Sequence, residues 1–198
     1  GIRSVDKICH RMELGKDTYT LGKIRPEMEE ELCRVLADFV RIMEGYRVDA
    51  YRAMASSAIS EAANSLYVLG KIRQLTGLSV TVLSNSEQRF LGYKALAAME
   101  DNFNKIIEKG TAILDLDGGS FQISLFDKDA LVTTQNIRMG SLRIRERLAG
   151  IQSETEHYEE MVEELIWNEV SSFKKMYLKD RKIENIMLIG DVFTDSVY

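Results

Sequence analysis

The residues best suited to chemistry in this chain lie in the stretch 113–127, which reads ILDLDGGSFQISLFD. Two carboxylates, Asp115 and Asp117, come directly before the pair Gly118-Gly119. Paired glycines let a backbone approach a ligand with its N–H groups pointing outward, and such N–H groups suit phosphate oxygens. Carboxylates beside a phosphate usually act through Mg²⁺. The same residues also fit a plain hairpin with a Gly-Gly turn, and this stretch alone does not decide between the two interpretations.

The composition restricts the classes of function. A chain of 198 residues with 45% apolar and 29% charged residues is typical of a globular protein with one domain or two small lobes. Its net charge of −5 argues against a general nucleic-acid binder, which needs a surplus of Lys and Arg. No apolar run is long enough for a membrane span, and no signal peptide is visible. Because Cys9 and Cys33 fit no metal or redox spacing, we expect a reduced, cytoplasmic setting.

Periodicity and turn residues predict an order of elements that would position the glycine-rich stretch. Pro26 opens an acidic first turn that begins a helix, and Gly77 ends another. The only tryptophan, Trp167, lies in the last predicted helix and is interpreted as a core anchor. The patterns predict helices near 26–45, 57–75, 87–101, 141–149 and 155–178, and strands near 47–54, 79–83, 112–117, 120–127, 130–138 and 186–189. This order is typical of an α/β protein with two lobes.

Four segments, in this order along the chain, resemble the exopolyphosphatase / guanosine pentaphosphate phosphohydrolase (Ppx/GppA) family. The first two, MASSAISEAANS and TGLSVTVLSNSEQRFLGYKAL, are similar to the family's Thr-Ser-Ala-Leu-Arg-Glu-Ala-x-Asn and Ser-Gly-x-Glu-Glu-Ala-Arg-Leu-x-Tyr elements. The third, LDLDGGSFQ, is similar to Asp-Ile-Gly-Gly-Gly-Ser-Thr-Glu, and the fourth, RMGSLRIRERL, to a Met-Gly-x-x-Arg-Leu segment. Together they extend over about half of the chain.

The resemblance implies an actin-like fold of the sugar kinase/Hsp70/actin superfamily, which has two ribonuclease H-like α/β lobes. Residues 1–108 would form the first lobe without its first strand and phosphate loop, and residues 109–198 would begin the second lobe. Because the sequence opens at Gly1 without a methionine and closes directly after a strand, we expect a fold that is incomplete at both ends.

The resemblance also implies a hydrolase that releases terminal phosphate from inorganic polyphosphate or guanosine pentaphosphate by Mg²⁺-assisted water attack. The binding partners would be these phosphate compounds and a second copy of the chain in a homodimer, with no nucleic acid and no membrane. Asp115 would bind Mg²⁺, Glu87 would orient or deprotonate the attacking water, and Gln88 could orient this water but not accept its proton. The residues expected to hold the phosphate are Asp117, Gly118, Gly119, Ser120 and Ser60.

Several positions depart from the family pattern at places that matter for chemistry. The family has Arg, Glu, Gly, Glu and Gly-Gly-Thr where this chain has Ser60, Gln88, Asp117, Gln122 and Gly190-Asp191-Val192. Glu87 is the nearest substitute base, although an acid in the first turn of a helix also serves stability alone. Arg52 or Arg89 could replace the missing cation, or both could be solvated surface residues.

Three functions therefore stand as hypotheses. The leading one is the hydrolase, and the second is a binding or sensing protein that kept the cleft and lost the chemistry. An actin-like kinase or ATPase comes last, because the fold also carries those activities but the sequence holds no adenine-binding signature.

Overall fold

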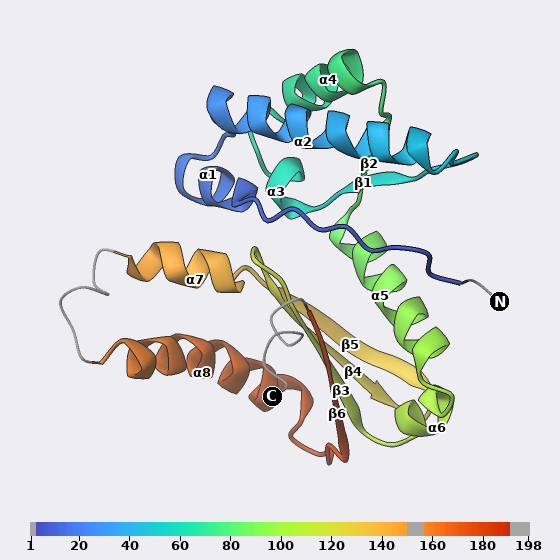
Figure 1. Cartoon of the computed structure of the whole chain (residues 1–198). Coiled ribbons are helices and arrows are strands. Elements are labelled where there is room, and N and C mark those ends of the chain that lie inside the picture. Colours follow the sequence, from blue (N-terminus) through green and yellow to red (C-terminus); the bar gives the residue numbers. More distant parts are fainter. Residues whose placement is uncertain (1–2, 150–156, 191–198) are drawn as a thin grey trace. The chain divides into compact units, whose positions relative to one another are not determined.

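The structure, a computed structural model, describes residues 3–149 and 157–190. These residues form two compact units, Gly1–Ser84 and Asn85–Tyr198, and each unit is described by itself (Figure 1). The lobe boundary expected after residue 108 stays a prediction. Positions 155–156 of the last predicted helix, and Asp191 and Val192, lie outside the described residues.

The first unit packs helices around a short parallel strand pair. Its helices are α1 (Leu14–Leu21), α2 (Pro26–Gly45), α3 (Ser57–Ser60) and α4 (Ser65–Thr76), and its strands are β1 (Ala53–Ala55) and β2 (Val80–Val82). Strand β1 pairs with β2 in parallel, with Met54 opposite Thr81. The core is formed by apolar side chains from α2, α3, α4, β1 and the adjoining loops, including Ile24, Val68 and Ile72. Helix α4 ends at Gly77, whose left-handed φ of 72° favours glycine, as the sequence predicted.

Two elements of the first unit differ from the sequence prediction. The helix expected over 57–75 is two helices, because Asn64 leaves the helical path and pairs with a residue 40 positions away. Its side-chain oxygen accepts from the N–H of Ile24 at 3.0 Å, and its amide donates to the Ile24 carbonyl at 2.8 Å. The strand expected over 47–54 is confined to β1, so that prediction was wrong for residues 47–52.

The second unit is built on a four-stranded sheet in the order β5-β4-β3-β6. Strands β3, β4 and β5 form an antiparallel meander, and β6 adds to β3 in parallel. The strands are β3 (Thr111–Leu116), β4 (Phe121–Asp127), β5 (Ala130–Ile137) and β6 (Asn185–Ile189), and the helices are α5 (Asn85–Met99), α6 (Phe103–Glu108), α7 (Ser141–Leu148) and α8 (Tyr158–Tyr177). All four strands lie within two residues of their predicted bounds.

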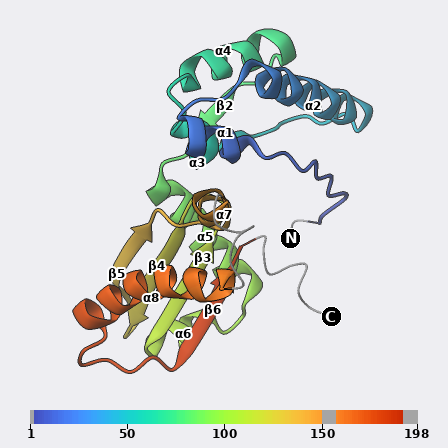
Figure 2. The ribbon, with the colours of Figure 1, turned by 90° about the vertical axis from the view of Figure 1, so that its left-hand side faces the viewer.

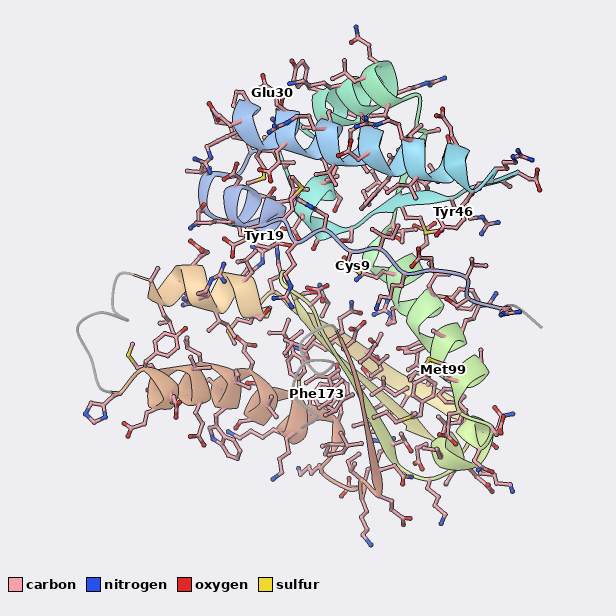
Figure 3. All side chains as sticks on the ribbon, viewed as in Figure 1. Cys9, Tyr19, Glu30, Tyr46, Met99 and Phe173 are labelled. Atoms are coloured by element: carbon pink, nitrogen blue, oxygen red, sulfur yellow. The ribbon has the colours of Figure 1, made fainter. Side chains whose placement is uncertain are left out.

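Each face of this sheet has its own helices (Figures 1 and 2). Ile123 and Leu125 of β4 pack against α7 and α8, where Phe173 is 3% exposed and points into the core (Figure 3). Phe126 and Ile113 pack on the opposite face against α5 and α6. Successive strand residues alternate between the faces, so the polar residues Gln122 and Ser124 lie on the side of α5.

Some features of the chain were missed or misjudged from the sequence. Helices α1 and α6 were not predicted, because they have only eight and six residues, too few for a clear helical pattern. The interpretation of Trp167 as a core anchor was wrong, since its side chain on α8 is 61% exposed. In the part of the chain that the structure describes, no helix has the length and apolar character needed to cross a membrane.

Candidate active site

The glycine-rich stretch forms the four-residue loop 117–120 between β3 and β4, closed by the pair Leu116 and Phe121. The N–H of Asp117 donates to the carbonyl of Ser120 at 3.0 Å. The side chain of Asp117 then turns back into its own loop. Its Oδ1 accepts from the N–H of Gly119 at 2.7 Å and from the N–H of Ser120 at 2.5 Å. Two of the loop N–H groups that the sequence assigns to a phosphate, those of Gly119 and Ser120, therefore already hold a carboxylate.

The first turn of α7 holds the other side of the same loop. The N–H of Ser141 donates to the carbonyl of Asp117 at 3.0 Å, and the N–H groups of Leu142 and Arg143 donate to the carbonyl of Gly118 at 3.1 Å. The Nε of Arg143 adds a bond of 2.6 Å to the carbonyl of Gly119. The first N–H groups of a helix have no partner within it, and here the loop carbonyls supply one. The loop backbone is thus fixed from both sides, its amides by Asp117 and its carbonyls by α7.

Gly140 permits this contact between loop and helix. A Cβ at this position would lie 2.4 Å from the carbonyl oxygen of Asp117 and 2.4 Å from the nitrogen of Ser120. Real Cβ atoms do not approach backbone atoms so closely, so any other residue would push the loop and α7 apart.

Helix α5 brings the predicted water-activating positions toward the loop. The amide Nε2 of Gln88 donates to Oδ2 of Asp117 at 3.4 Å, which places Gln88 beside the loop carboxylate. Glu87 lies in the first turn of α5 and is exposed. Arg89 donates from Nη1 to Oγ1 of Thr134 on β5 at 2.8 Å and from Nη2 to Oγ of Ser86 at 3.0 Å, so its guanidinium links α5 to the sheet.

Asp115 belongs to a row of oxygen-bearing side chains on the face of the sheet toward α5. It lies opposite Gln122 on β4, and Gln122 lies opposite Asn136 on β5. Gln122 is 2% exposed, and its buried Oε1, like the Oδ1 of Asn136, has no hydrogen-bond partner. Oxygen ligands of this kind suit a hard cation such as Mg²⁺. No cluster of three His, Cys, Asp or Glu side chains that could hold a metal occurs among the described residues, so a cation beside Asp115 would also need neutral oxygens and oxygens of its phosphate ligand.

Most, but not all, of the residues predicted for the site belong to the same unit. Glu87, Gln88, Asp115 and the loop 117–120 all belong to the second unit. Ser60 is the exposed last residue of α3 in the first unit. The roles of all these residues in catalysis and in phosphate or metal binding stay predictions.

Sequence reasoning missed Gly140 and Arg143 as residues of the loop site. The signal was present, because both lie in the segment RMGSLRIRERL that resembles the family. The segment was treated as a marker of the family and not as part of the site. Only the hydrogen bonds from α7 to the loop show what its glycine and arginine do.

Comparison with known proteins shows the family of the chain. The model of the Ppx/GppA phosphatase family matches residues 2–197. This chain belongs to the Ppx/GppA phosphatase family. The resemblance inferred from the four segments is confirmed, and so is a fold of the actin-like α/β class.

Individual Ppx/GppA relatives are similar over part of their length. Exopolyphosphatase 1 of Mycobacterium leprae is 30% identical over 108 residues, which are 54% of this chain and 30% of that protein. The crystal structure of an exopolyphosphatase from Cytophaga hutchinsonii is 21% identical with a TM-score of 0.67, and the match covers 89% of this chain and 55% of that one. The crystal structure of an exopolyphosphatase-like protein is 18% identical with a TM-score of 0.72, over 94% and 57% of the two chains. The chain thus spans little more than half the length of these structures.

Proposed function

We propose that this protein is a phosphoanhydride hydrolase that releases terminal phosphate from inorganic polyphosphate or guanosine pentaphosphate. The observation that carries the proposal is the match of residues 2–197 to a family of phosphatases. The loop 117–120 supports it, because a backbone with several N–H groups on one side can hold an anion. A terminal phosphoanhydride bears several negative charges, so its hydrolysis depends mainly on positioning and on electrostatic stabilisation.

The residues of the second unit would divide this work. The N–H groups of Gly119 and Ser120 would orient the terminal phosphoryl group, and Arg143 would keep the loop in shape through the carbonyl of Gly119. Glu87 would take a proton from the attacking water, because it is the carboxylate at the start of α5. Gln88 cannot accept a proton near neutral pH, so it would contribute only hydrogen bonds.

Asp115 would hold Mg²⁺, together with the unpartnered oxygen of Gln122. When bound, Mg²⁺ would neutralise phosphate charge. The donor set fits such an ion, since one carboxylate with neutral oxygens leaves room for phosphate and water ligands.

The test is phosphate release by the 198-residue chain, with Mg²⁺, from long-chain polyphosphate and from guanosine pentaphosphate in parallel. We expect Asp115→Asn to abolish release and Glu87→Gln to lower it by about tenfold or more. Asp101→Asn and Glu164→Gln are matched controls, because they make the same changes at exposed positions outside the site. A wild-type rate in Glu87→Gln would exclude Glu87 as the base, and release that survives in Asp115→Asn would contradict its role as the metal ligand.

A second candidate function is a protein that binds or senses phosphate compounds without cleaving them. The carboxylate of Asp117 on the loop amides favours it, as does Gln88 at the position of the expected base. This function predicts saturable binding of polyphosphate in calorimetry with no phosphate release in the assay above. Turnover by the wild-type chain would contradict it.

The homodimer and the cytoplasmic location expected from the sequence stay predictions. Sedimentation equilibrium of the purified chain would test the dimer, and a single monomeric species at high concentration would contradict it.

A further inference from the structure

The carboxylate of Asp117 accepts hydrogen bonds from its own loop and from α5. Oδ1 of Asp117 accepts from the N–H groups of Gly119 and Ser120, at 2.7 and 2.5 Å. Oδ2 faces the hydroxyl of Ser120 and the amide of Gln88, both at 3.4 Å. Backbone amides, a hydroxyl and a side-chain amide are the donors that a phosphoryl oxygen would also use. The carboxylate of Asp117 therefore occupies hydrogen-bond donors that could otherwise bind an external anion.

A phosphoryl group and this carboxylate cannot use the same donors at once. Hydrogen bonds to a charged acceptor are stronger than those between neutral groups, so the two amides hold the carboxylate firmly. A phosphate that approached with the carboxylate in place would also meet a like charge at short range. An external anion can reach the N–H groups of Gly119 and Ser120 only when the Asp117 side chain rotates away.

Gln88 fits this arrangement in a way that glutamate would not. Its Nε2 donates toward Oδ2 of Asp117, so a neutral amide faces the carboxylate. A glutamate in the same place would bring a second carboxylate toward the first, and two adjacent carboxylates repel each other. Gln88 and Asp117, which both depart from the family pattern, are thus in contact, and the neutral amide of one is compatible with the carboxylate of the other.

We propose that Asp117 is an internal occupant of the anion site, held by the loop amides and by Gln88, and that it competes with phosphoryl ligands. The inference rests on the proposed function only in taking a phosphoryl group as the external ligand. Asp117 is in this view a specificity-determining residue, because a ligand must displace its carboxylate to reach the loop amides.

The direct test is calorimetric titration of the 198-residue chain with sodium tripolyphosphate. Asp117→Gly removes the competing anion, so we expect its dissociation constant to fall about tenfold or more relative to wild type. Asp117→Asn keeps a side chain able to close the turn but removes the charge, so we expect an intermediate affinity. Asp129→Gly is the matched control, because Asp129 is exposed in the β4–β5 turn with a left-handed φ of 61° that suits glycine.

A second readout needs no ligand. The amide hydrogens of Gly119 and Ser120 should exchange slowly with solvent in the wild type and faster in Asp117→Gly, while those of β4 remain protected. Protection at β4 also shows that the variant is folded. Unchanged exchange at Gly119 and Ser120 would overturn the proposal.

The pairing of positions 88 and 117 is tested by a double-mutant cycle on thermal stability. Gln88→Glu should lower the midpoint of unfolding when Asp117 is present and should cost less in the Asp117→Gly background. Additive effects of the two substitutions would overturn the coupling.

These outcomes separate the inference from the proposed function. Equal affinity of wild type and Asp117→Gly for tripolyphosphate, or no binding by either, overturns the inference. Tighter binding by Asp117→Gly without phosphate release by any variant overturns the hydrolase function and supports the inference. Phosphate release by the wild type, together with equal affinities of wild type and Asp117→Gly for tripolyphosphate, supports the hydrolase function and overturns the inference.

Discussion

Tyr93 of α5 donates its hydroxyl to Oγ of Ser124 on β4 across 2.6 Å. The ring of Tyr93 also meets Phe126 edge-on, with centroids 5.2 Å apart. Ser124 in turn shares a hydrogen bond of 3.1 Å with Thr134, to which Arg89 donates. This chain of polar contacts joins α5 to two strands of the sheet, and it therefore fixes the helix that carries Glu87 and Gln88.

Removing the hydroxyl of Tyr93 should weaken this connection without changing the packing of the ring. We expect Tyr93→Phe to lower the free energy of unfolding by about 1 kcal/mol, the usual contribution of one hydrogen bond. Urea unfolding followed by circular dichroism would measure it. Tyr67→Phe is the control, because Tyr67 is 63% exposed and its change should be close to zero. Equal effects of the two variants would contradict a role for the buried network.

Gly140 should tolerate no side chain. Because a Cβ there would meet backbone atoms of the loop at 2.4 Å, Gly140→Ala should cost about 2 kcal/mol or more of stability. Gly70→Ala provides a matched control in the middle of α4, where nothing lies within 4 Å of the added Cβ. That substitution should instead stabilise the chain by about 0.5–1 kcal/mol. Thermal unfolding of both variants measures the difference. A Gly140→Ala variant as stable as wild type would contradict the close contact between α7 and the loop.

Asp17 in α1 should make the stability of the chain depend on pH in the acid range. Its carboxylate is 1% exposed and accepts from the N–H and Nε of Arg25, each at 2.9 Å. Burial alone would raise the pKa of Asp17, but the hydrogen bonds and charge of Arg25 outweigh burial and hold the pKa below its usual value. A lowered pKa in the folded state gives stability that is present above the unfolded pKa and is lost as pH falls through the folded pKa.

We therefore expect Asp17→Asn to reduce the free energy of unfolding by about 1–3 kcal/mol at pH 7. The difference from wild type should shrink as the pH falls below about 4, because the carboxyl of Asp17 then binds a proton in the unfolded chain before it does so in the folded one. Denaturant unfolding at several pH values measures this. Asp49→Asn, an exposed position in the same unit, should show no such trend. A constant difference between Asp17→Asn and wild type across the range would contradict the role of the charge.

The fluorescence of Trp167 should report an exposed side chain. As the only tryptophan of the chain and 61% exposed, it should emit close to tryptophan in water and be quenched readily by acrylamide. Unfolding in urea should therefore shift its emission little. A blue-shifted emission that moves on unfolding would show that the side chain is covered in solution.

The strands around the loop were predictable because their signals are local. Phe121, Ile123 and Leu125 alternate with polar residues, and the period of two predicts both the strand and its apolar face. Pro26 and the acidic turn after it marked the start of α2 at the correct residue. The break at Asn64 was hidden, because it depends on Ile24, a partner 40 residues away.

The candidate site also has one part that could be predicted from the sequence and one part that could not. The sequence shows that Asp117 adds a charge at the loop, and the tendency of Asp to bond N–H groups two and three residues ahead could have suggested where its carboxylate lies. That Gln88 meets the same carboxylate could not be derived, because it requires the position of α5 over the sheet. The hydrogen bonds from α7 to the loop could not be derived either, because they depend on the path of the chain after β5.

The connectivity of the second unit's sheet also bears on how quickly it forms. Strands β3, β4 and β5 follow each other along the chain, so their pairing closes only short loops. Strand β6 must instead find β3 across 74 residues, the separation of Asn185 and Thr111. Contacts between residues so distant in sequence form slowly. We therefore expect the meander of residues 111–137, with the loop at its first turn, to form before β6 pairs with β3. Folding of this sheet would then begin at the meander and end with the addition of β6.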